Sequence, residues 1–179
     1  MASCVTAAIS DTLRGVRPKD PCPCRSSASY ADCCLPAHDG TKPPAAPREL
    51  VRARYSAFAL GLGEFLHATL SSDHEDHADG DDVPRRVREL STAGKGLKYM
   101  GVDVLASTDT EALFVAKVFE KGKDRGFAEL SSFAWEDGTL RYVGGLLLPK
   151  AALPSAIATM PIDAFRAYAE AHPDLVVGG

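Results

Sequence analysis

The sequence lacks any apolar run approaching the roughly 18 residues of a membrane-spanning helix, so we expect no transmembrane segment. It also lacks a basic N-terminal region followed by a long apolar stretch. The first cation is Arg14, and the apolar stretch Cys4–Ile9 is short. We therefore expect no signal peptide and a cytoplasmic protein.

A surplus of positive charge is missing as well. The chain has 20 lysines and arginines against 24 acidic residues, which gives a net charge of −4. Because nucleic-acid binding leaves a basic footprint, we expect neither a nucleic-acid nor a membrane partner. The motifs G-x-G-x-x-G, Walker A and G-x-S-x-G do not occur, so nothing supports a nucleotide-binding or serine-hydrolase activity.

Cysteine and proline are present but unevenly distributed. Four of the five cysteines lie within 22–34, and seven of the twelve prolines lie within 18–47. The length of 179 residues suits one domain with a small appendage. We predict a tail, a cysteine element, a globular domain with a core of its own and a C-terminal extension, at residues 1–20, 21–44, 45–149 and 150–179.

Two hydrophobic periods divide the globular domain. Helical spacing predicts a helix over 47–60 that ends at Gly61, a second over about 63–70 and a third from Pro84. Alternating spacing with short turns predicts four antiparallel strands, near 97–106, 112–119, 127–135 and 140–148. Together these predict an α+β fold in which three helices cover a four-stranded sheet, followed by a C-terminal helix near 161–171.

The four clustered cysteines predict a metal site. Cys22, Cys24, Cys33 and Cys34 offer the thiolate set that zinc prefers, and a segment this short cannot bury a stabilising core. We expect one structural Zn²⁺ per chain on these four residues, with His38 as an alternative ligand. A redox pair or four free thiols are the competing interpretations.

The spacing Cys22-x-Cys24-x8-Cys33-Cys34 resembles the SEC-C motif, named after the C-terminal zinc element of the SecA translocation ATPase. The segment 50–61 resembles the arginine-rich first helix of the YchJ-like family of bacterial proteins. In that family a SEC-C motif precedes a nuclear transport factor 2-like domain. Further matches are Phe65-Leu66 with Thr69, Glu129-x-Ser131-x-Phe133, and Asp137-Gly138 before Tyr142-Val143.

The resemblance implies an α+β cone, in which a strongly curved antiparallel sheet wraps around helices and can enclose a pocket. Such a fold does not by itself fix an activity. The SEC-C element contacts partner proteins in SecA, so we expect a protein-interaction or adaptor module rather than an enzyme. The alternative is a small-molecule binder or enzyme that uses the pocket of the cone.

Glu129 and Ser131 lie two residues apart and share a strand face with aromatic residues. A carboxylate there is either an acid or base with a raised pKa or, as we favour, the ion-pair partner of Arg54. The candidate pocket residues are Tyr55, Tyr99, Glu129, Ser131 and Tyr142. Asp103 is on the strand face of Tyr99 and could line the same cavity.

The sequence also carries expectations for the loop 73–82 and for the cavity of the cone. The loop 73–82, with His74 and His77, matches neither the EF-hand nor the HExxH spacing, so we expect a solvated loop. A cavity of about 300 Å³ or more with converging polar groups would favour the small-molecule function. A cone plugged by aromatic side chains would favour the adaptor; the candidates are Phe58, Phe114, Phe133 and Trp135.

Overall fold

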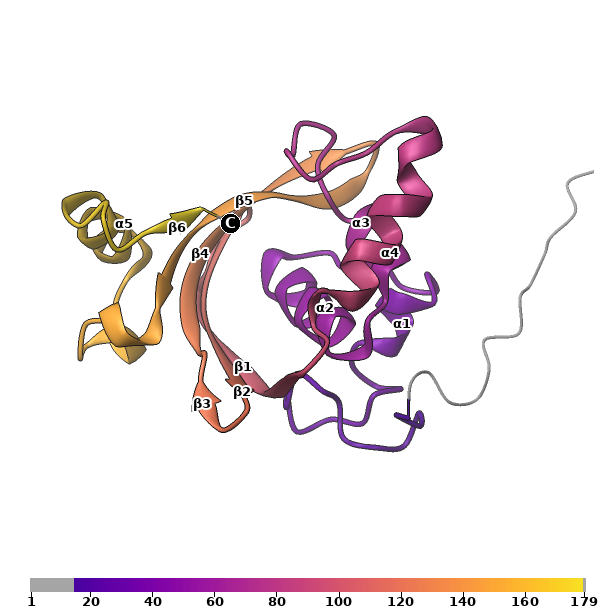
Figure 1. Cartoon of the computed structure of the whole chain (residues 1–179), viewed down its shortest axis with the longest axis horizontal. Helices are drawn as coiled ribbons and strands as arrows, with labels where there is room; N and C mark the ends of the chain where they lie inside the picture. Colours follow the sequence, from indigo (N-terminus) through magenta and orange to yellow (C-terminus); the bar gives the residue numbers. More distant parts are fainter. Residues whose placement is uncertain (1–14, 179) are drawn as a thin grey trace, which may run out of the picture.

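The computed structural model describes residues 15–178; most of the predicted tail therefore lies outside the described residues. A curved sheet wraps around the helix α2 (Pro47–Leu60), and the helices α3 (Gly63–Ala68) and α4 (Val83–Ala93) close the open side of the cone (Figure 1). The cysteine element lies beside α2 at one end, and the C-terminal extension lies behind the sheet. None of the helices in the described part combines the length and the apolar character that a membrane crossing requires.

The helices begin and end close to the predicted residues. The first predicted helix is α2, which spans Pro47–Leu60. It ends at Gly61, whose left-handed backbone conformation (φ of 62°) terminates the helix. The helix α3 spans Gly63–Ala68, and α4 spans Val83–Ala93 after the short 3₁₀ turn η1 (Gly80–Asp82). The short helix α1, Leu35–His38, was not predicted because four residues carry no periodicity.

The sheet is antiparallel, as predicted. Its long strands are β1 (Leu97–Ser107), β2 (Glu111–Glu120), β4 (Phe127–Glu136) and β5 (Thr139–Pro149). They follow the order β1-β2-β4-β5, and β6 (Val177–Gly178) is added beyond β5. The strand β3 (Lys123–Asp124) pairs with β2. Sequence patterns missed β3 and β6, since strands of two residues show no alternation.

The cysteine element and the globular domain share one core, so the predicted separate core is wrong. Cys22, Cys24 and Cys34 are buried in the same apolar cluster as Val51 and Tyr55 of α2. The backbone N–H of Val102 in β1 also donates to the carbonyl oxygen of Cys24 at 3.2 Å. Because so short an element has too little apolar surface of its own, it is buried against α2 and β1.

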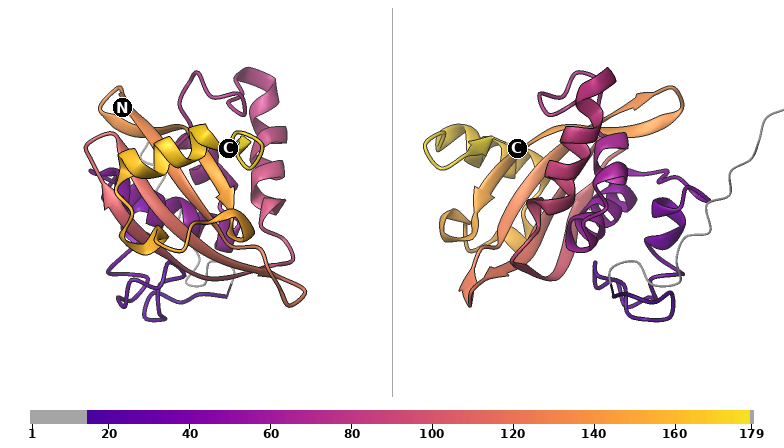
Figure 2. Two further views of the ribbon diagram at one scale, coloured as in Figure 1. Left: turned by 90° about the vertical axis from the view of Figure 1, so that its left-hand side faces the viewer. Right: turned by 45° about the vertical axis from the view of Figure 1, so that its right-hand side comes forward.

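The C-terminal extension covers the outer face of the sheet. It contains the 3₁₀ turns η2 (Lys150–Ala152) and η3 (Ile157–Thr159) and the helix α5 (Ile162–Ala171). Figure 2 shows α5 lying across the strands on the side away from α2. Phe165, which is fully buried, packs in a second apolar cluster with Leu113, Leu130 and Leu148. The helix therefore docks on its own sheet.

Candidate functional site

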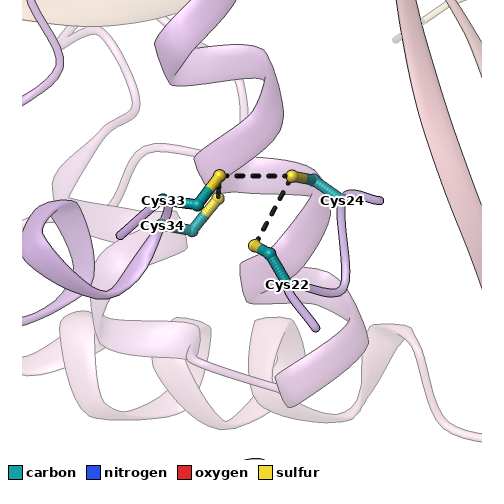
Figure 3. A group of neighbouring side chains, drawn as sticks. All are labelled: Cys22, Cys24, Cys33 and Cys34. Carbon is teal, nitrogen blue, oxygen red and sulfur yellow. Dashed lines mark hydrogen bonds between the residues drawn. The ribbon is translucent and has the colours of Figure 1, made fainter. Parts of the chain in front are cut away.

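The cysteine element folds so that two pairs of sulfurs face each other. Left-handed backbone at Arg25 and Ser27, with φ of 61° and 73°, turns the loop after Cys24. The sulfur of Cys24 lies 3.4 Å from that of Cys22 and 3.5 Å from that of Cys33. Cys33 and Cys34, directly before α1, have sulfurs 3.7 Å apart (Figure 3).

The cluster has the dimensions of a tetrahedral zinc site. Zn–S bonds of about 2.3 Å place the sulfurs of a regular tetrahedron about 3.8 Å apart. All four sulfurs here lie within 4.8 Å of one another, and three of the four cysteines are buried. The residues present therefore fit Zn²⁺ as a donor set, and the four close cysteines could hold a metal ion.

Three hydroxyl–sulfur contacts surround the cluster. The hydroxyl of Ser56 in α2 donates to the sulfur of Cys34 at 3.4 Å and lies 3.8 Å from that of Cys22. The Ser26 hydroxyl lies 3.0 Å from the sulfur of Cys33. Hydroxyl donors of this kind stabilise the negative charge of metal-bound thiolates. Sequence analysis missed Ser56, because nothing in a helical pattern marks which residue will face a distant loop.

Protons are unevenly shared within the cluster. Hydrogen bonding to Cys22 lowers the pKa of Cys24 and raises the pKa of Cys34. The close packing of sulfur therefore makes the thiols of the cluster differ in acidity. A bound dication takes the place of such protons, because metal ligation requires thiolates.

His38 does not belong to the group of metal donors. Its Nδ1 lies 2.8 Å from the hydroxyl of Tyr30, and its Nε2 lies 2.9 Å from the carbonyl oxygen of Ala53. A carbonyl only accepts, so Nε2 donates to Ala53 and Nδ1 accepts from Tyr30 in the neutral ring. Burial lowers the pKa of His38, which favours that neutral form. The histidine joins α1 to α2, and the geometry does not support it as a zinc ligand.

A cavity of about 380 Å³ lies between α2, α4 and the concave face of the sheet. Its wall is largely apolar, and all five predicted pocket residues line it. A cavity of this size, with polar side chains among its lining residues, favours the small-molecule function. The residues that line the cavity include Val51, Arg54, Tyr55, Phe58, His74, Asp76, Ala93, Tyr99, Phe114, Arg125, Phe127, Glu129, Ser131, Phe133 and Tyr142.

Glu129 supplies a carboxylate to the wall of the cavity and is only 8% exposed. Its Oε1 accepts hydrogen bonds from the hydroxyl of Ser131 at 2.5 Å and from that of Tyr142 at 2.9 Å. Its Oε2 has no hydrogen-bond partner among the described residues. Among the described residues it is not one of the unpartnered polar atoms that are fully buried, so it keeps some accessible surface. Glu129 lines the cavity, so Oε2 is the carboxylate oxygen that is left for a ligand there.

Arg54 does not form the predicted ion pair with Glu129. Its Nη1 instead donates to the carbonyl oxygen of Leu66 at 2.9 Å and to the hydroxyl of Thr69 at 2.7 Å. The guanidinium carbon lies 4.7 Å from the centroid of the Tyr142 ring, in a cation–π contact. Burial lowers the pKa of Arg54 to about 10, so the side chain stays charged at neutral pH.

A bulge in β1 decides which side chains reach the cavity. The register with β2 shifts between Tyr99 and Gly101, where the N–H of Gly101 donates to the hydroxyl of Tyr55 at 2.7 Å. Beyond the bulge the alternation changes phase. Tyr99 lines the cavity, whereas Asp103 faces solvent and pairs with Lys117 at 2.6 Å. The prediction that Asp103 lines the cavity is therefore wrong.

The aromatic plug that would favour the expected adaptor function is not present among the described residues. Phe58, Phe114 and Phe133 form part of the cavity wall and leave the space open. Trp135 is 52% exposed and does not line the cavity. Trp135 lies near the turn of the β4–β5 hairpin, where it pairs with Leu140.

The loop 73–82 is not fully solvated, contrary to the prediction. His74 is buried at the rim of the cavity, and its ring centroid lies 5.4 Å from that of Tyr142. Burial lowers the pKa of His74. His77 stacks on His67 at 5.2 Å. Within residues 15–178 the cysteine cluster is the one group of donors arranged for a metal, so the loop offers no second centre.

The fold and the cluster together define an α+β cone that carries an N-terminal four-cysteine element. A comparison with protein families matches residues 46–145 to the middle nuclear transport factor 2-like domain of YchJ. The chain belongs to this YchJ-like family. A UPF0225 protein of Deinococcus radiodurans is 33% identical over 129 residues, which cover 70% of this chain and 88% of that protein. A UPF0225 protein of Bordetella pertussis is 34% identical over 131 residues, covering 69% and 90%.

Solved structures share the fold. The solution structure of a SEC-C motif containing protein from Rhodopseudomonas palustris aligns with a TM-score of 0.56 at 24% identity. It covers 69% of this chain and 95% of that one. A crystal structure of a SEC-C motif containing protein from Psychrobacter arcticus aligns with a TM-score of 0.53 at 20% identity, covering 69% and 78%. At these identities the likeness concerns the fold alone.

Proposed function

We propose that this protein binds a small molecule in the cavity of the cone and that a structural Zn²⁺ on the four cysteines supports the walls of that cavity. The observation that carries the proposal is the free Oε2 of Glu129. A nine-tenths buried carboxylate that lines an apolar cavity of about 380 Å³, and whose second oxygen has no partner among the described residues, favours a binding role over a packing role.

The zinc has a structural role in this proposal. Four protein ligands, Cys22, Cys24, Cys33 and Cys34, leave no coordination position open for a substrate or water. Bound there, the metal would supply cross-linking of the cysteine element and no chemistry in the cavity.

Helix α2 connects the two sites. Its Ser56 faces the sulfurs of Cys34 and Cys22, while its neighbours Arg54 and Tyr55 line the cavity. Consecutive helical residues point in directions about 100° apart, so one helix serves both sites. Fixing the cysteine element against α2 therefore helps to hold the cavity wall in place.

The adaptor function remains a prediction. It rests on the resemblance to the SEC-C element of SecA, and no contact within the described residues identifies a partner. The cavity is open where that function anticipated a plugged cone. A protein partner bound to the cysteine element would be compatible with a ligand in the cone, so the two functions do not exclude each other.

The test blocks the cavity at its rim. Ala93 lies on the exposed side of α4 and lines the cavity, so Ala93→Trp places an indole at the opening with little effect on the core. Binding of 2-methoxynaphthalene to the purified full chain is measured by its fluorescence change. We expect the affinity to fall at least about tenfold in this variant, because the indole excludes the probe by contact.

The matched control is Ala167→Trp, the same substitution at an exposed position of α5 on the opposite side of the sheet. It should bind the probe like the parent chain. Equal binding by both variants would show that the probe does not use the cavity, and no binding by the parent chain would contradict the proposal for ligands of this kind.

A further inference from the structure

We propose that the ligand of this cavity is a neutral, aromatic molecule that donates a hydrogen bond from a hydroxyl or ring N–H group to Oε2 of Glu129. This inference rests on the proposed function and specifies its ligand class. It follows from the charges on the wall, from the single free acceptor and from the aromatic lining.

The charges on the wall favour a neutral ligand. The inner wall carries one cation, Arg54, and one anion, Glu129, which are not joined in an ion pair. At the rim Asp76 and Arg125 add one charge of each sign. A ligand with a net charge would lose its hydration and meet one like charge on the inner wall, which cancels much of its attraction to the opposite charge.

Arg54 is the weaker candidate for a primary ligand contact. Its Nη1 is already used by Leu66 and Thr69, and one face of the guanidinium is covered by the ring of Tyr142. A cation whose Nη1 is hydrogen-bonded and whose face is stacked on a ring is partly stabilised by the protein itself.

Glu129, by contrast, lacks a partner on one side. The hydroxyls of Ser131 and Tyr142 both donate to Oε1, and Oε2 receives no donor from the described residues. A carboxylate oxygen is an acceptor only, so the group that completes this site must be a donor. A hydrogen bond to an ionised acceptor is stronger than one between neutral groups.

The acceptor is held in place before a ligand arrives. A Cβ at Gly145 on the neighbouring strand β5 would lie 2.5 Å from Oε1 and 2.8 Å from Cγ of Glu129. Glycine at this position therefore leaves the space in which the carboxylate lies. With two hydrogen bonds on Oε1 and a strand backbone beneath it, Oε2 has little freedom, which reduces the entropy lost on binding.

The lining sets the aromatic character of the ligand. Rings reach the cavity from α2 and from the four strands β1, β2, β4 and β5, so a planar apolar molecule can make edge and face contacts with several of them. The rings are those of Tyr55, Phe58, Tyr99, Phe114, Phe127, Phe133 and Tyr142. The volume of about 380 Å³ is at the lower end of the range for small-molecule sites.

The test compares four naphthalenes with the zinc-loaded full chain at pH 7. The probes are 2-naphthol, which is neutral and a donor; 2-methoxynaphthalene, which is neutral without a donor; 2-naphthoate, an anion; and 2-naphthylmethylammonium, a cation. We expect 2-naphthol to bind at least about tenfold tighter than 2-methoxynaphthalene, as one hydrogen bond to a carboxylate would give. Both ions should bind more weakly than either neutral probe.

The carboxylate is then removed. Glu129→Met keeps the length of the side chain without its oxygens, and the preference for 2-naphthol over 2-methoxynaphthalene should fall below about threefold while the latter binds as before. Glu170→Met, at an exposed position of α5, is the matched control and should keep the preference. The comparison of probes on the parent chain stands even if Glu129→Met does not fold.

The outcomes separate the two proposals. If all four probes bind with similar affinity, or if an ion binds best, the ligand class is wrong and the proposed function stands. If none of the probes binds, the proposed function fails for this size of ligand and the inference fails with it.

Discussion

His38 shows how burial assigns a role to a single residue. The side chain follows the last cysteine by four positions, a spacing compatible with metal ligation, yet both ring nitrogens are used by Tyr30 and Ala53. A neutral ring with one donor and one acceptor satisfies both contacts at once. The residue therefore contributes to the packing of the element on α2 rather than to the metal site.

Replacing His38 by Ala should leave the zinc content at one per chain and lower the free energy of unfolding by about 1–3 kcal/mol. The loss comes from two buried hydrogen bonds whose partners are left unpaired. Elemental analysis and urea denaturation at neutral pH measure the two quantities. Loss of the metal in this variant would identify His38 as a ligand after all.

The same variant should also change how the free energy of unfolding depends on pH. Burial lowers the pKa of His38, so the unfolded chain takes up its proton at a higher pH than the folded chain. The free energy of unfolding of the parent chain should therefore fall as the pH drops below the ordinary histidine value of about 6.5. His38→Ala should lose less stability over the same pH range.

At the scale of elements, the C-terminal extension decides what covers the outer face of the sheet. The helix α5 buries Phe165 against Leu113 and Leu130, and Arg166 forms a bidentate contact with Glu111 at 2.7 and 3.0 Å. A helix this short is marginal by itself, so its stability comes from this docking. Without it, an apolar sheet face would be open to solvent.

Deleting residues 150–179 should raise self-association. The deletion exposes Leu113, Leu130 and Leu148 on one face, and apolar patches of that kind associate with one another. Size-exclusion chromatography with light scattering should show a concentration-dependent increase in mass. A milder variant, Phe165→Asp in the full chain, should act in the same direction, and a truncated chain that stays monomeric and soluble would contradict the prediction.

At the scale of the whole molecule, one core joins the cysteine element to the cone. Cys22, Cys24 and Cys34 pack with Tyr55, and Cys24 also accepts a backbone hydrogen bond from Val102 of β1. Loss of a bound metal would therefore lower the stability of the cone as well as that of the cysteine element. The same contacts bring the metal site within one helix of the cavity wall.

Replacing Cys24 by Ser should remove zinc and lower the melting temperature of the whole chain. The reason is that metal binding adds to the stability of every part that folds with the site. Zinc analysis and thermal denaturation followed by the near-ultraviolet signal of Trp135 and the tyrosines measure both effects. Cys4→Ser is the control and should change neither; full zinc occupancy in Cys24→Ser would refute the ligand assignment.

The sequence by itself determined the elements and the set of four cysteines that could hold a metal ion. Local signals do not depend on distant residues: Pro47 and Gly61 delimit α2, alternating residues mark the four long strands, and the spacing of the four cysteines indicates metal binding. The pair Glu129 and Ser131 was also found, because residues two apart on a strand share a face.

Only the tertiary structure determined which elements contact one another and which side chains are buried or paired between them. The bulge after Tyr99 turned Asp103 outward, and the stacking of Arg54 on Tyr142 replaced the expected ion pair and left one oxygen of Glu129 free. The shared core and the burial of His38 and His74 likewise depend on contacts between distant segments. Sequence patterns carry the period of an element but not its neighbours, and it is the neighbours that determine burial, charge pairing and access to the cavity.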